Sequence, residues 1–378
     1  NAGMDLHILT SSQIDGCSYD EMLKRYKSGD PAAKNLRNLS KACFHPDTEV
    51  MTRKGWKQIS FLDEGEEVLS AQPDDLTGEV RVLWETPLQL TERDSPVGEL
   101  VHLQNEGMDL RVTPDHRMLA FRMNGTHKVV MPEELAGCRS WRNAGMFSDG
   151  TWSPDLRVLR LAVAAQADGH YTPGGLVRYG FTKQRKIDRL RSLAAGACTE
   201  TTYTNGASPK DVTSITLDNA LSAQVRDLLD YDKRIPWTWL GLTTAARAAV
   251  LEEVQYWDGT KPNRWRQYKY TNTDQQSVDV IQALATMGGR KTRMVKTDPR
   301  GNRQRVYALS VKDHAHTRGG NLRTARIPYT GKVVCLSVPS TFIIARDGGV
   351  PVVVGQCNFG YPGGMGPAAM AESAAGYG

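Results

Sequence analysis

Two stretches of short, turn-separated strands lie on either side of a long stretch with helical periodicity, and this split pattern is the strongest constraint on the fold. The first strand-like stretch covers residues 43–150 and the second covers residues 327–356. In the second, Asp347-Gly348-Gly349 separates two apolar alternations, which is a strong hairpin signal. The pattern predicts an all-β unit that is interrupted by an inserted α/β domain.

The middle of the chain differs from its flanks in periodicity and in charge. Helical periods occur at residues 157–167, 183–195, 219–229, 244–257 and 275–287, with strand-like pieces such as 303–311 between them. The whole chain has 47 Lys and Arg against 42 Asp and Glu, but the excess of positive charge lies in residues 155–325 and the flanks are acidic. This distribution predicts a polyanionic partner for the middle domain alone.

Several classes of protein are excluded by composition. No stretch of about 18 uncharged apolar residues is present, so we expect no membrane span, and without a signal peptide we expect a cytoplasmic location. The six cysteines contain no Cys-x-x-Cys pair, which argues against a zinc cluster and against a disulfide framework. The first residue is Asn1, so we expect the chain to be part of a longer protein.

Four sequence signals occur in a characteristic order along the two strand-like stretches. Cys43 opens the first, and Thr113-Pro114-Asp115-His116 follows within it. The second contains Val333-Val334-Cys335-Leu336-Ser337-Val338-Pro339-Ser340 and ends at Gly355-Gln356-Cys357. Together they resemble the motifs of an intein, a self-splicing element, over residues 43–356. The resemblance implies an all-β Hint-type horseshoe built from residues 43–150 and 327–356.

The resemblance also implies a chemistry for the first of these residues. The Cys43 thiol, whose reference pKa of about 8.5 lies near neutral pH, would attack the preceding carbonyl and form a thioester. His116 would protonate the departing amide nitrogen, and Thr113 would help to polarise the bond. A satisfied structural histidine is the plain alternative for His116. No cofactor is expected for this reaction.

At the other end, Cys357 would accept the acyl group and Gln356 would cyclise to release the insert. Inteins usually end in Asn, and the extra rotatable bond of Gln costs on the order of 1 kcal/mol, which is about a fivefold slower step. Gly355 and Ser340-Thr341 stand where the family usually has histidines, so we expect the C-terminal step to be slow. Cys335 is a candidate for coupling the two steps, and an ordinary core cysteine is the alternative.

The middle domain resembles a LAGLIDADG homing endonuclease. Leu161-Ala162-Val163-Ala164-Ala165-Gln166-Ala167-Asp168-Gly169 matches the motif, and Leu251-Glu252-Glu253-Val254-Gln255-Tyr256-Trp257-Asp258-Gly259 is a more diverged second copy. The resemblance implies that Asp168 and Asp258 share Mg²⁺. Lys233 matches a basic position that the family often has before the second helix, and it is a candidate catalytic residue. Helix C-terminal turns are the alternative for the two Asp-Gly pairs.

Clusters of basic residues support double-stranded DNA, at the insert-free site in the host gene, as the partner of this domain. They are Lys183, Arg185, Lys186, Arg189 and Arg191, then Arg264, Arg266 and Lys269 among aromatic residues, then Arg290, Lys291, Arg293, Arg303 and Arg305. Arg and Lys on strands suit phosphate contacts and major-groove recognition. A solvated charged surface is the alternative, and we expect a monomer.

The flanks resemble another family. Joining Ala42 to Cys357 places Arg37, Lys41 and Phe359 at i, i+4 and i+8 of one helix, as in the fingers helix of a family A DNA polymerase of the phage type. The resemblance implies that these three residues bind the nucleotide in the host protein, and an ordinary basic amphipathic helix is the alternative. Gly363 stands where that family usually has Tyr.

The predicted fold is therefore α+β, an all-β Hint-type horseshoe split by an α/β LAGLIDADG-type domain and flanked by short polymerase segments. The predicted boundaries are 1–42, 43–150, 151–326, 327–356 and 357–378. Three alternatives stay open: an inactive relic, a splicing element whose DNA-binding domain no longer cuts, and a secreted Hint-type autoprocessor.

Overall fold

A computed structural model of the chain describes residues 8, 11–12, 15–33, 43–74, 77–95, 98–122, 126–204, 211–260, 267–297 and 304–356. The chain forms two compact units. The first combines residues 1–52, 56–143 and 316–378, and the second combines residues 53–55 and 144–315. The first unit is thus assembled from two stretches that the second one separates in sequence, as the split strand pattern predicts.

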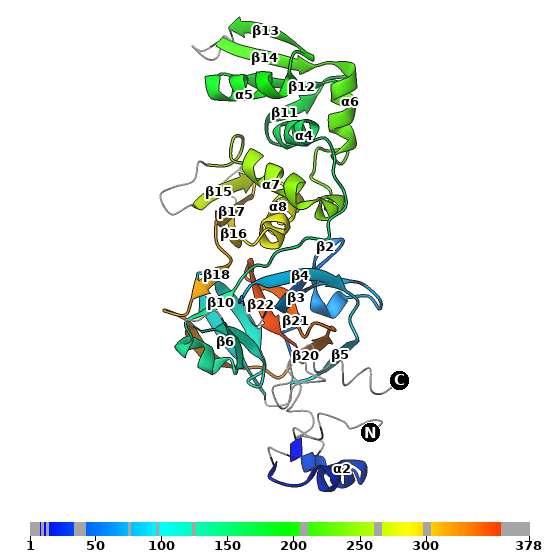
Figure 1. The fold of residues 1–378 in the computed structure, drawn as a ribbon, viewed down its shortest axis with the longest axis vertical. Helices are drawn as coiled ribbons and strands as arrows, with labels where there is room; N and C mark the ends of the chain where they lie inside the picture. The colour runs from blue at the N-terminus through cyan, green and yellow to red at the C-terminus, as the bar shows by residue number, and fades with distance from the viewer. Residues whose placement is uncertain are drawn as a thin grey trace. The chain divides into compact units, whose positions relative to one another are not determined.

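The first unit is built around a ten-stranded sheet with the order β18-β10-β8-β22-β21-β1-β3-β4, in which β2 pairs with β1 and β9 with β8. Its strands are β1 (Glu49–Thr52), β2 (Gly55–Gln58), β3 (Val68–Pro73), β4 (Val80–Glu85), β8 (Met118–Phe121), β9 (His127–Val130), β10 (Ser140–Arg142), β18 (His316–Arg318), β21 (Phe342–Asp347) and β22 (Val350–Gly355). Antiparallel pairing of β21 with β1 and with β3 joins the two halves of the unit in one sheet, and β3 and β21 can be followed in Figure 1.

Two smaller sheets and two short 3-10 helices complete this unit. One sheet has the order β19-β6-β7 and the other pairs β20 with β5. These elements are β5 (Gln89–Asp94), β6 (Glu99–Asn105), β7 (Met108–Val112), β19 (Arg323–Pro328), β20 (Lys332–Ser337), η1 (Ile59–Phe61) and η2 (Glu133–Gly137). The hydrophobic core draws on both halves of the unit, for example on Phe44, Trp141, Val334 and Ile343. Burial of these apolar side chains ties residues 43–143 to residues 316–356.

The predicted hairpin near the end of the unit is confirmed. β21 and β22 pair antiparallel from Asp347↔Val350 to Phe342↔Gly355. Gly348 and Gly349 form the turn with φ values of 54° and 77°. This left-handed region suits glycine because it lacks a Cβ. The turn therefore fixes the register that carries the chain to Gly355 at the end of the strand.

The second unit repeats a helix followed by antiparallel strands. Its helices are α4 (Leu156–Asp168), α5 (Gln184–Ala194), α6 (Asn219–Asp227), α7 (Thr244–Glu253) and α8 (Gln275–Met287), with the 3-10 helix η3 (Trp237–Gly241). One sheet has the order β11-β12-β14-β13, from β11 (Gly169–Tyr171), β12 (Val177–Phe181), β13 (Cys198–Thr204) and β14 (Asp211–Leu217). The other has the order β15-β17-β16, from β15 (Gln267–Asn272), β16 (Lys291–Thr297) and β17 (Val306–Lys312).

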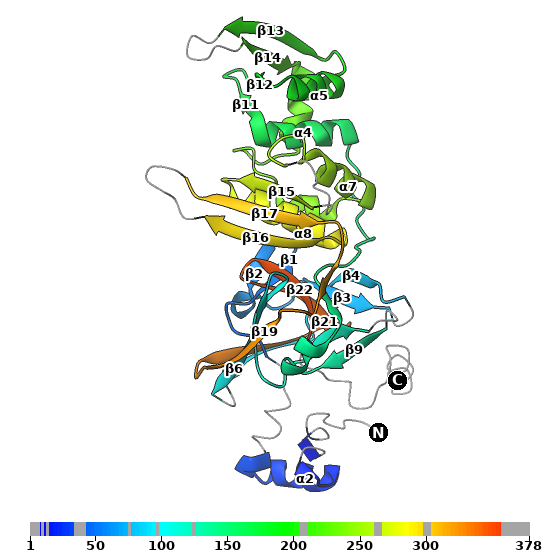
Figure 2. The ribbon, with the colours of Figure 1, turned by 90° about the vertical axis from the view of Figure 1, so that its left-hand side faces the viewer.

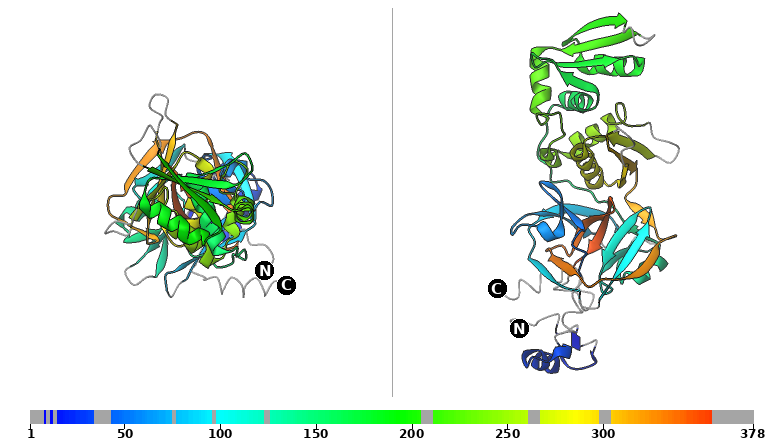
Figure 3. Two further views of the ribbon diagram at one scale, coloured as in Figure 1. Left: turned by 90° about the horizontal axis from the view of Figure 1, so that it is seen from above. Right: turned by 180° about the vertical axis from the view of Figure 1, so that it is seen from behind.

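Packing within the second unit follows from its apolar helix faces. α4 and α5 both contact β12 (Figure 3), and α8 lies against β15, β16 and β17 (Figure 2). α4 and α7 contact each other, and seven residues of α4 are buried. The five predicted helical segments correspond to α4, α5, α6, α7 and α8, so the prediction of a mixed α and β chain is confirmed.

The sequence passes from one unit to the other at residues that differ from the predicted domain boundaries. β18 pairs with β10 and β19 pairs with β6, so residues 316–326 pack in the first unit although the prediction gave them to the inserted domain. Residues 144–150 pack in the second unit, where Phe147 donates its backbone N–H to Met287. Contacts between residues far apart in sequence determine to which unit residues 144–150 and 316–326 belong. The local sequence pattern does not reveal such contacts.

Before Cys43 the structure describes one named helix, α2 (Tyr19–Lys27), which Ser18 caps at its N-terminus. Within the described residues, no helix is both long and apolar enough to cross a membrane.

Candidate functional site

Cys43 is held at the point where β7 and β20 approach each other. It is fully buried, and the next residue, Phe44, forms single bridges to Val334 of β20 and to Val112 at the end of β7. The Phe44 N–H donates to Val334 at 2.9 Å, and Val334 returns a hydrogen bond at 3.0 Å. The backbone at Cys43 is therefore fixed by strands from both halves of the first unit.

Thr113 closes a two-point contact with Cys43. The amide nitrogen of Cys43 donates to Thr113 Oγ1 at 3.0 Å, and the Thr113 N–H donates to the carbonyl oxygen of Cys43 at 3.0 Å. Thr113 directly follows β7, so the strand delivers its hydroxyl to this amide. The structure thus brings together two predicted residues that are 70 positions apart in sequence.

His116 is fully buried next to the same residues, with its ring centroid 4.4 Å from that of Phe44. Burial lowers the pKa of His116 to about 3, and the nearby backbone groups of Cys43 and Gly355 act in the opposite direction. Both ring nitrogens are buried, and the backbone groups that act on them belong to Cys43 and Gly355. The imidazole is therefore uncharged at neutral pH and close to the backbone at both ends of residues 43–356.

Two further residues at this end were not predicted. Arg93 of β5 donates its Nε to the Cys43 sulfur at 3.4 Å. Burial raises the pKa of Asp115 to about 6, although a hydrogen bond from Thr113 and the charges of Arg93 and Arg117 lower it. Asp115 was visible as the third residue of the Thr-x-x-His motif. No sequence motif pointed to Arg93, because it reaches Cys43 only through the pairing of β5 with β20, two strands far apart in sequence.

Cys335 is covalently joined to Cys43. The two residues form a disulfide with their Cα atoms 4.4 Å apart, across a sequence separation of 292. The expectation that the cysteines form no disulfide is therefore wrong for this pair. β20 delivers Cys335 beside Cys43 through the same bridge that fixes Phe44, and no local spacing in the sequence reveals such a contact.

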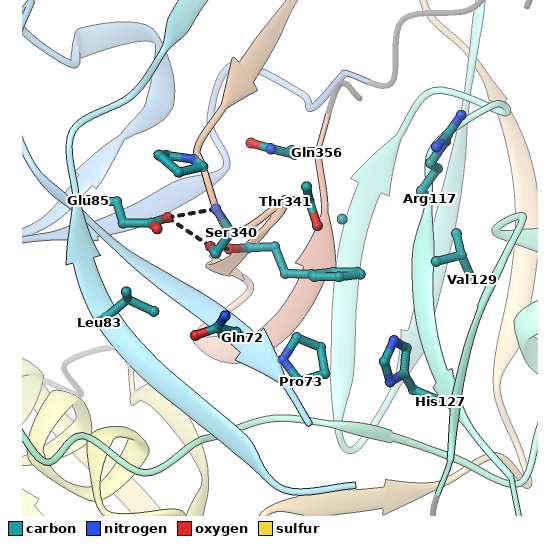
Figure 4. A pocket seen from close by; sticks show the side chains of 13 residues that line it. Gln72, Pro73, Leu83, Glu85, Arg117, His127, Val129, Ser340, Thr341 and Gln356 are labelled. Carbon is teal, nitrogen blue, oxygen red and sulfur yellow. Dashed lines mark hydrogen bonds between the residues drawn. The ribbon is translucent and has the colours of Figure 1, made fainter. Parts of the chain in front are cut away.

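Gln356 follows β22 and its side chain is buried. Its Nε2 donates to the carbonyl oxygen of Val338 at 2.5 Å, and the Val338 N–H donates to its Oε1. A pocket lies beside this contact, and Glu85, Ser340 and Thr341 contribute to its lining (Figure 4). The carboxamide is thus held at both of its polar atoms by one residue of the backbone.

The structure gives a steric reason for the glycine at position 355. A Cβ added at Gly355 would lie 2.5 Å from the backbone oxygen of Arg117, which accepts a hydrogen bond from the Gly355 N–H at 2.9 Å. The histidine that the intein family usually has at this position would clash with that strand contact. Glycine therefore fits at position 355 because the backbone of Arg117 approaches too closely for a side chain.

The second unit brings together the acidic residues of its two motif copies. Asp168 ends α4 and forms an ion pair with Lys186 of α5. Burial raises the pKa of Asp258 to about 6, and the charge of Asp168 raises it further. Asn272 donates to Asp258 at 3.0 Å. Lys233 donates its Nζ to the Gly169 carbonyl oxygen at 2.5 Å.

The pKa shifts at this site indicate that the charged side chains of Asp168, Asp258 and Lys233 interact with one another. Burial lowers the pKa of Lys233, while the charges of Asp168 and Asp258 raise it. Two carboxylates and two amines therefore lie within electrostatic reach of one another, as the motif reading predicts for Asp168, Asp258 and Lys233. Lys186 was predicted as part of a basic cluster and not as a member of this site.

Glu253 explains why the second motif copy departs from the small residues of the first. Its carboxylate is completely buried, accepts from Arg160 of α4 at 2.8 Å and from Arg189 of α5 at 3.0 Å, and also accepts from Trp257 at 3.0 Å. The departure is therefore a buried ion pair that joins α7 to α4 and α5.

We expect Glu253→Ala to destabilise the second unit by about 3–5 kcal/mol, since it leaves two arginines without their buried partner. Denaturant unfolding of the second unit, followed by the fluorescence of its tryptophans, measures this loss. Glu252→Ala is the matched control, because Glu252 is exposed and, among the described residues, forms its ion pair with Arg160. Equal losses for both variants would contradict the prediction.

The predicted basic clusters differ in whether their charges are paired with carboxylates or exposed. On α5, Lys186, Arg189 and Arg191 pair with Asp168, Glu253 and Glu200, so this cluster is largely neutralised. In the β15-β17-β16 sheet of the second unit, Lys269 of β15 and Arg293 of β16 are exposed. Both pair with Ser310 of the central strand, β17. This sheet face offers positive charge in an arrangement that suits a phosphate backbone.

Seven of the residues singled out from the sequence lie outside the described residues. They are the second nucleophile Cys357, the host residues Arg37, Lys41 and Phe359, and the basic residues Arg264, Arg266 and Arg303.

Comparisons with known proteins place these sites in context. No family model matches the chain. The chain is similar to the ribonucleoside-diphosphate reductase subunit beta of Aquifex aeolicus (strain VF5), with 23% identity over 363 residues, which is 85% of this chain and 51% of that protein. The chain thus spans about half the length of this curated relative. The comparison gives no support to a polymerase host.

Among solved structures, similar chains include an AceL NrdHF class 3 split intein in a splice-inactive, GSH-linked form, with a TM-score of 0.32, 11% identity, and coverage of 84% of this chain and 99% of that chain. A mesophilic variant of the homing endonuclease I-DmoI has a TM-score of 0.31, 10% identity, and coverage of 42% and 89%. At these TM-scores the likeness carries no argument about fold or function, so the interpretation below depends on the site residues.

Proposed function

We propose that residues 43–356 are an intein that excises itself and joins Ala42 to Cys357. The observation that carries this proposal is the convergence of Cys43, Thr113 and His116 with the Gly355–Gln356 end of the insert. Splicing requires both ends of the excised segment at one site. Thr113 hydrogen-bonds to Cys43, the His116 ring packs on Phe44, and the Gly355 N–H donates to Arg117, the residue after His116.

The first step exchanges a peptide bond for a thioester. The Cys43 sulfur attacks the Ala42 carbonyl carbon, a C–S bond forms, and the C–N bond to Cys43 breaks. His116 is neutral at rest, so it can take the thiol proton as a base and pass it to the departing amide nitrogen as an acid. The hydrogen bond from the Cys43 amide to Thr113 Oγ1 holds that nitrogen in place during the transfer.

The remaining steps move the acyl group and release the insert. The Cys357 sulfur attacks the thioester carbonyl and frees the Cys43 thiol. Gln356 Nε2 then attacks the Gln356 carbonyl carbon, the bond to Cys357 breaks, and the Cys357 amine leaves with the proton. An S-to-N shift finally gives an ordinary Ala42–Cys357 peptide bond. Cys335 is adjacent to Cys43, which supports its proposed part in coupling these steps once the disulfide is reduced.

Mass spectrometry of the expressed chain tests the proposal directly. Splicing gives an insert of 314 residues (43–356) and a joined flank of 64 residues. The sample must be reduced first, because the attack needs a free Cys43 thiol. A reduced chain that stays at 378 residues, and that thiols do not cleave at Cys43, would sink the splicing proposal.

Thr113→Val is expected to slow thioester formation by about 100-fold, since it removes a fixed polar contact to the reacting amide. The rate of hydroxylamine-induced cleavage before Cys43 measures this step. Thr126→Val, a change in a loop of the same unit, serves as the control. A Thr113→Val chain that cleaves at the unmutated rate would show that the contact to Cys43 has no part in the reaction.

We further propose that the second unit cuts double-stranded DNA at the site in the host gene that lacks the insert. The charge of Asp168 acts on the buried carboxyl of Asp258, to which Asn272 donates, so two hard oxygen donors of the kind that Mg²⁺ prefers lie near each other. Asp168 and Asp258 would hold the ion, which when bound supplies charge stabilisation at the phosphodiester. Lys233 and Lys186 would face the phosphate, and Lys269 and Arg293 would contact the DNA backbone.

The identity of the host protein, the oligomeric state and the cellular location are proposals separate from splicing and DNA cleavage. We keep the polymerase host as a proposal that depends only on the Arg37, Lys41 and Phe359 pattern, and splicing does not depend on it. A monomer in the cytoplasm is likewise proposed from the sequence alone. Sequencing the joined flank in its natural gene identifies the host.

A further inference from the structure

The C-terminal end of the insert lacks the family's usual histidines, so something else must orient Gln356 for cyclisation. The contacts of Gln356 run to one residue, Val338, through both the N–H and the carbonyl of its backbone. A primary amide has one acceptor and one donor group side by side, and Val338 presents the complementary pair. The orientation of the Gln356 side chain therefore depends on the conformation at Val338.

Val338 begins a tight turn between β20 and β21. Its carbonyl oxygen accepts from the Thr341 N–H at 3.1 Å as well as from Gln356. Thr341 has a φ of 69°, in the left-handed region that non-glycine residues adopt only where the surroundings hold them. The turn must therefore be stabilised from outside its own backbone.

Glu85, at the end of β4, provides that support. Its Oε2 accepts from the Ser340 N–H at 3.1 Å and from the Ser340 hydroxyl at 2.7 Å, so one carboxylate oxygen holds the turn at two points (Figure 4). β4 is the edge strand of the large sheet, and its pairing with β3 fixes the position of Glu85. Glu85 thus holds Ser340 by hydrogen bonds, and Ser340 is linked through the backbone of the turn, closed by the Thr341-to-Val338 hydrogen bond, to the residue that holds the carboxamide of Gln356.

We infer that Glu85 is a positioning residue for Gln356 cyclisation, and that the turn it holds selects Gln over the shorter Asn at position 356. This inference rests on the proposed splicing function. An Asn side chain is shorter by one methylene and cannot reach both Val338 groups from the same backbone position. The contact thereby compensates for the less favourable six-membered ring by fixing the nucleophilic nitrogen.

The test uses the full chain with Cys43→Ala, in which loss of residues 357–378 reports only the cyclisation of Gln356. The product ends in a ring that is one water lighter than the hydrolysed chain. In this background, Glu85→Ala is expected to slow the release at least about 10-fold, because small displacements of reacting groups cost up to about 100-fold. Glu85→Gln, which keeps an oxygen acceptor, should restore most of the rate.

Two controls separate a positioning role from a general loss of structure. Glu79→Ala changes an exposed carboxylate just before the same strand and should leave the release unchanged. With Cys43 restored, Glu85→Ala should keep the unmutated rate of hydroxylamine cleavage before Cys43, because that end of the insert has its own contacts. Loss of both activities together would overturn the inference in favour of a structural role.

Gln356→Asn gives the sharpest outcome. Ring size alone predicts about a fivefold faster release for Asn, whereas the Val338 contact predicts a slower one. A faster release, or a Glu85→Ala chain that releases its flank at the unmutated rate, would overturn the inference while leaving splicing intact. A chain without any mutation that releases neither flank would instead overturn the splicing proposal itself.

Discussion

An oxidised sample of the chain is expected not to splice until its disulfide is reduced, and then to yield the excised insert and the joined flanks. Cys43 is the proposed first nucleophile, and its sulfur is bonded to Cys335. A sulfur in a disulfide has no thiolate to attack the Ala42 carbonyl, so the first step is blocked completely. The phosphine TCEP is the suitable reductant, because it takes up one oxygen from water and leaves two thiols without cleaving thioesters. Mass spectrometry against time measures the appearance of the excised insert.

Variants of single cysteines show which sulfur is responsible. Cys335→Ser cannot form the bond, so its hydroxylamine cleavage before Cys43 should no longer depend on TCEP. Cys198→Ser, at a free cysteine of the other unit, should keep the full dependence. An oxidised chain that carries the Cys43–Cys335 disulfide by peptide mapping and still splices at the reduced rate would contradict the prediction.

The sequence anticipates those features that depend on neighbouring residues. Turn chemistry at Asp347-Gly348-Gly349 locates the β21–β22 hairpin, and a 3.6-residue period locates α4 and α8, because both are local properties of the chain. The order of Cys43, Thr113 and His116 also points to one site. Each of these signals lies within a few residues, where sequence spacing and spatial distance agree.

The features that the sequence does not reveal depend on strand register across long separations. Arg93 reaches the Cys43 sulfur because β5 pairs with β20, and Glu85 reaches Ser340 because β4 lies at the edge of the large sheet. From the sequence alone, Glu253 is only a departure from the small residues of the motif. In the structure its carboxylate accepts hydrogen bonds from Arg160 and Arg189. Partners for a charged residue are therefore the least predictable part of both sites.

Asp168→Ala is expected to lower DNA cleavage by about 1,000-fold or more while splicing continues at its usual rate. The variant removes one of two carboxylates proposed to hold Mg²⁺, and a charged ligand at the reacting phosphate contributes several kcal/mol to catalysis. The substrate is a DNA duplex that encodes the joined flanks, residues 1–42 followed by residues 357–378. Cleavage in Mg²⁺ is measured on a gel, and splicing is measured by mass in the same samples.

The matched control is Asp188→Ala on α5, which removes an exposed carboxylate of the same unit without touching Asp258 or Lys233. It should cut at the unmutated rate, since its only described ion pair is an exposed one with Arg191. Cutting by Asp168→Ala at the unmutated rate would remove Asp168 from the proposed site. If the unmutated chain binds the duplex in a gel shift but never cuts it in Mg²⁺, the second unit is a DNA-binding domain, and the close pair of carboxylates is a remnant of a former nuclease.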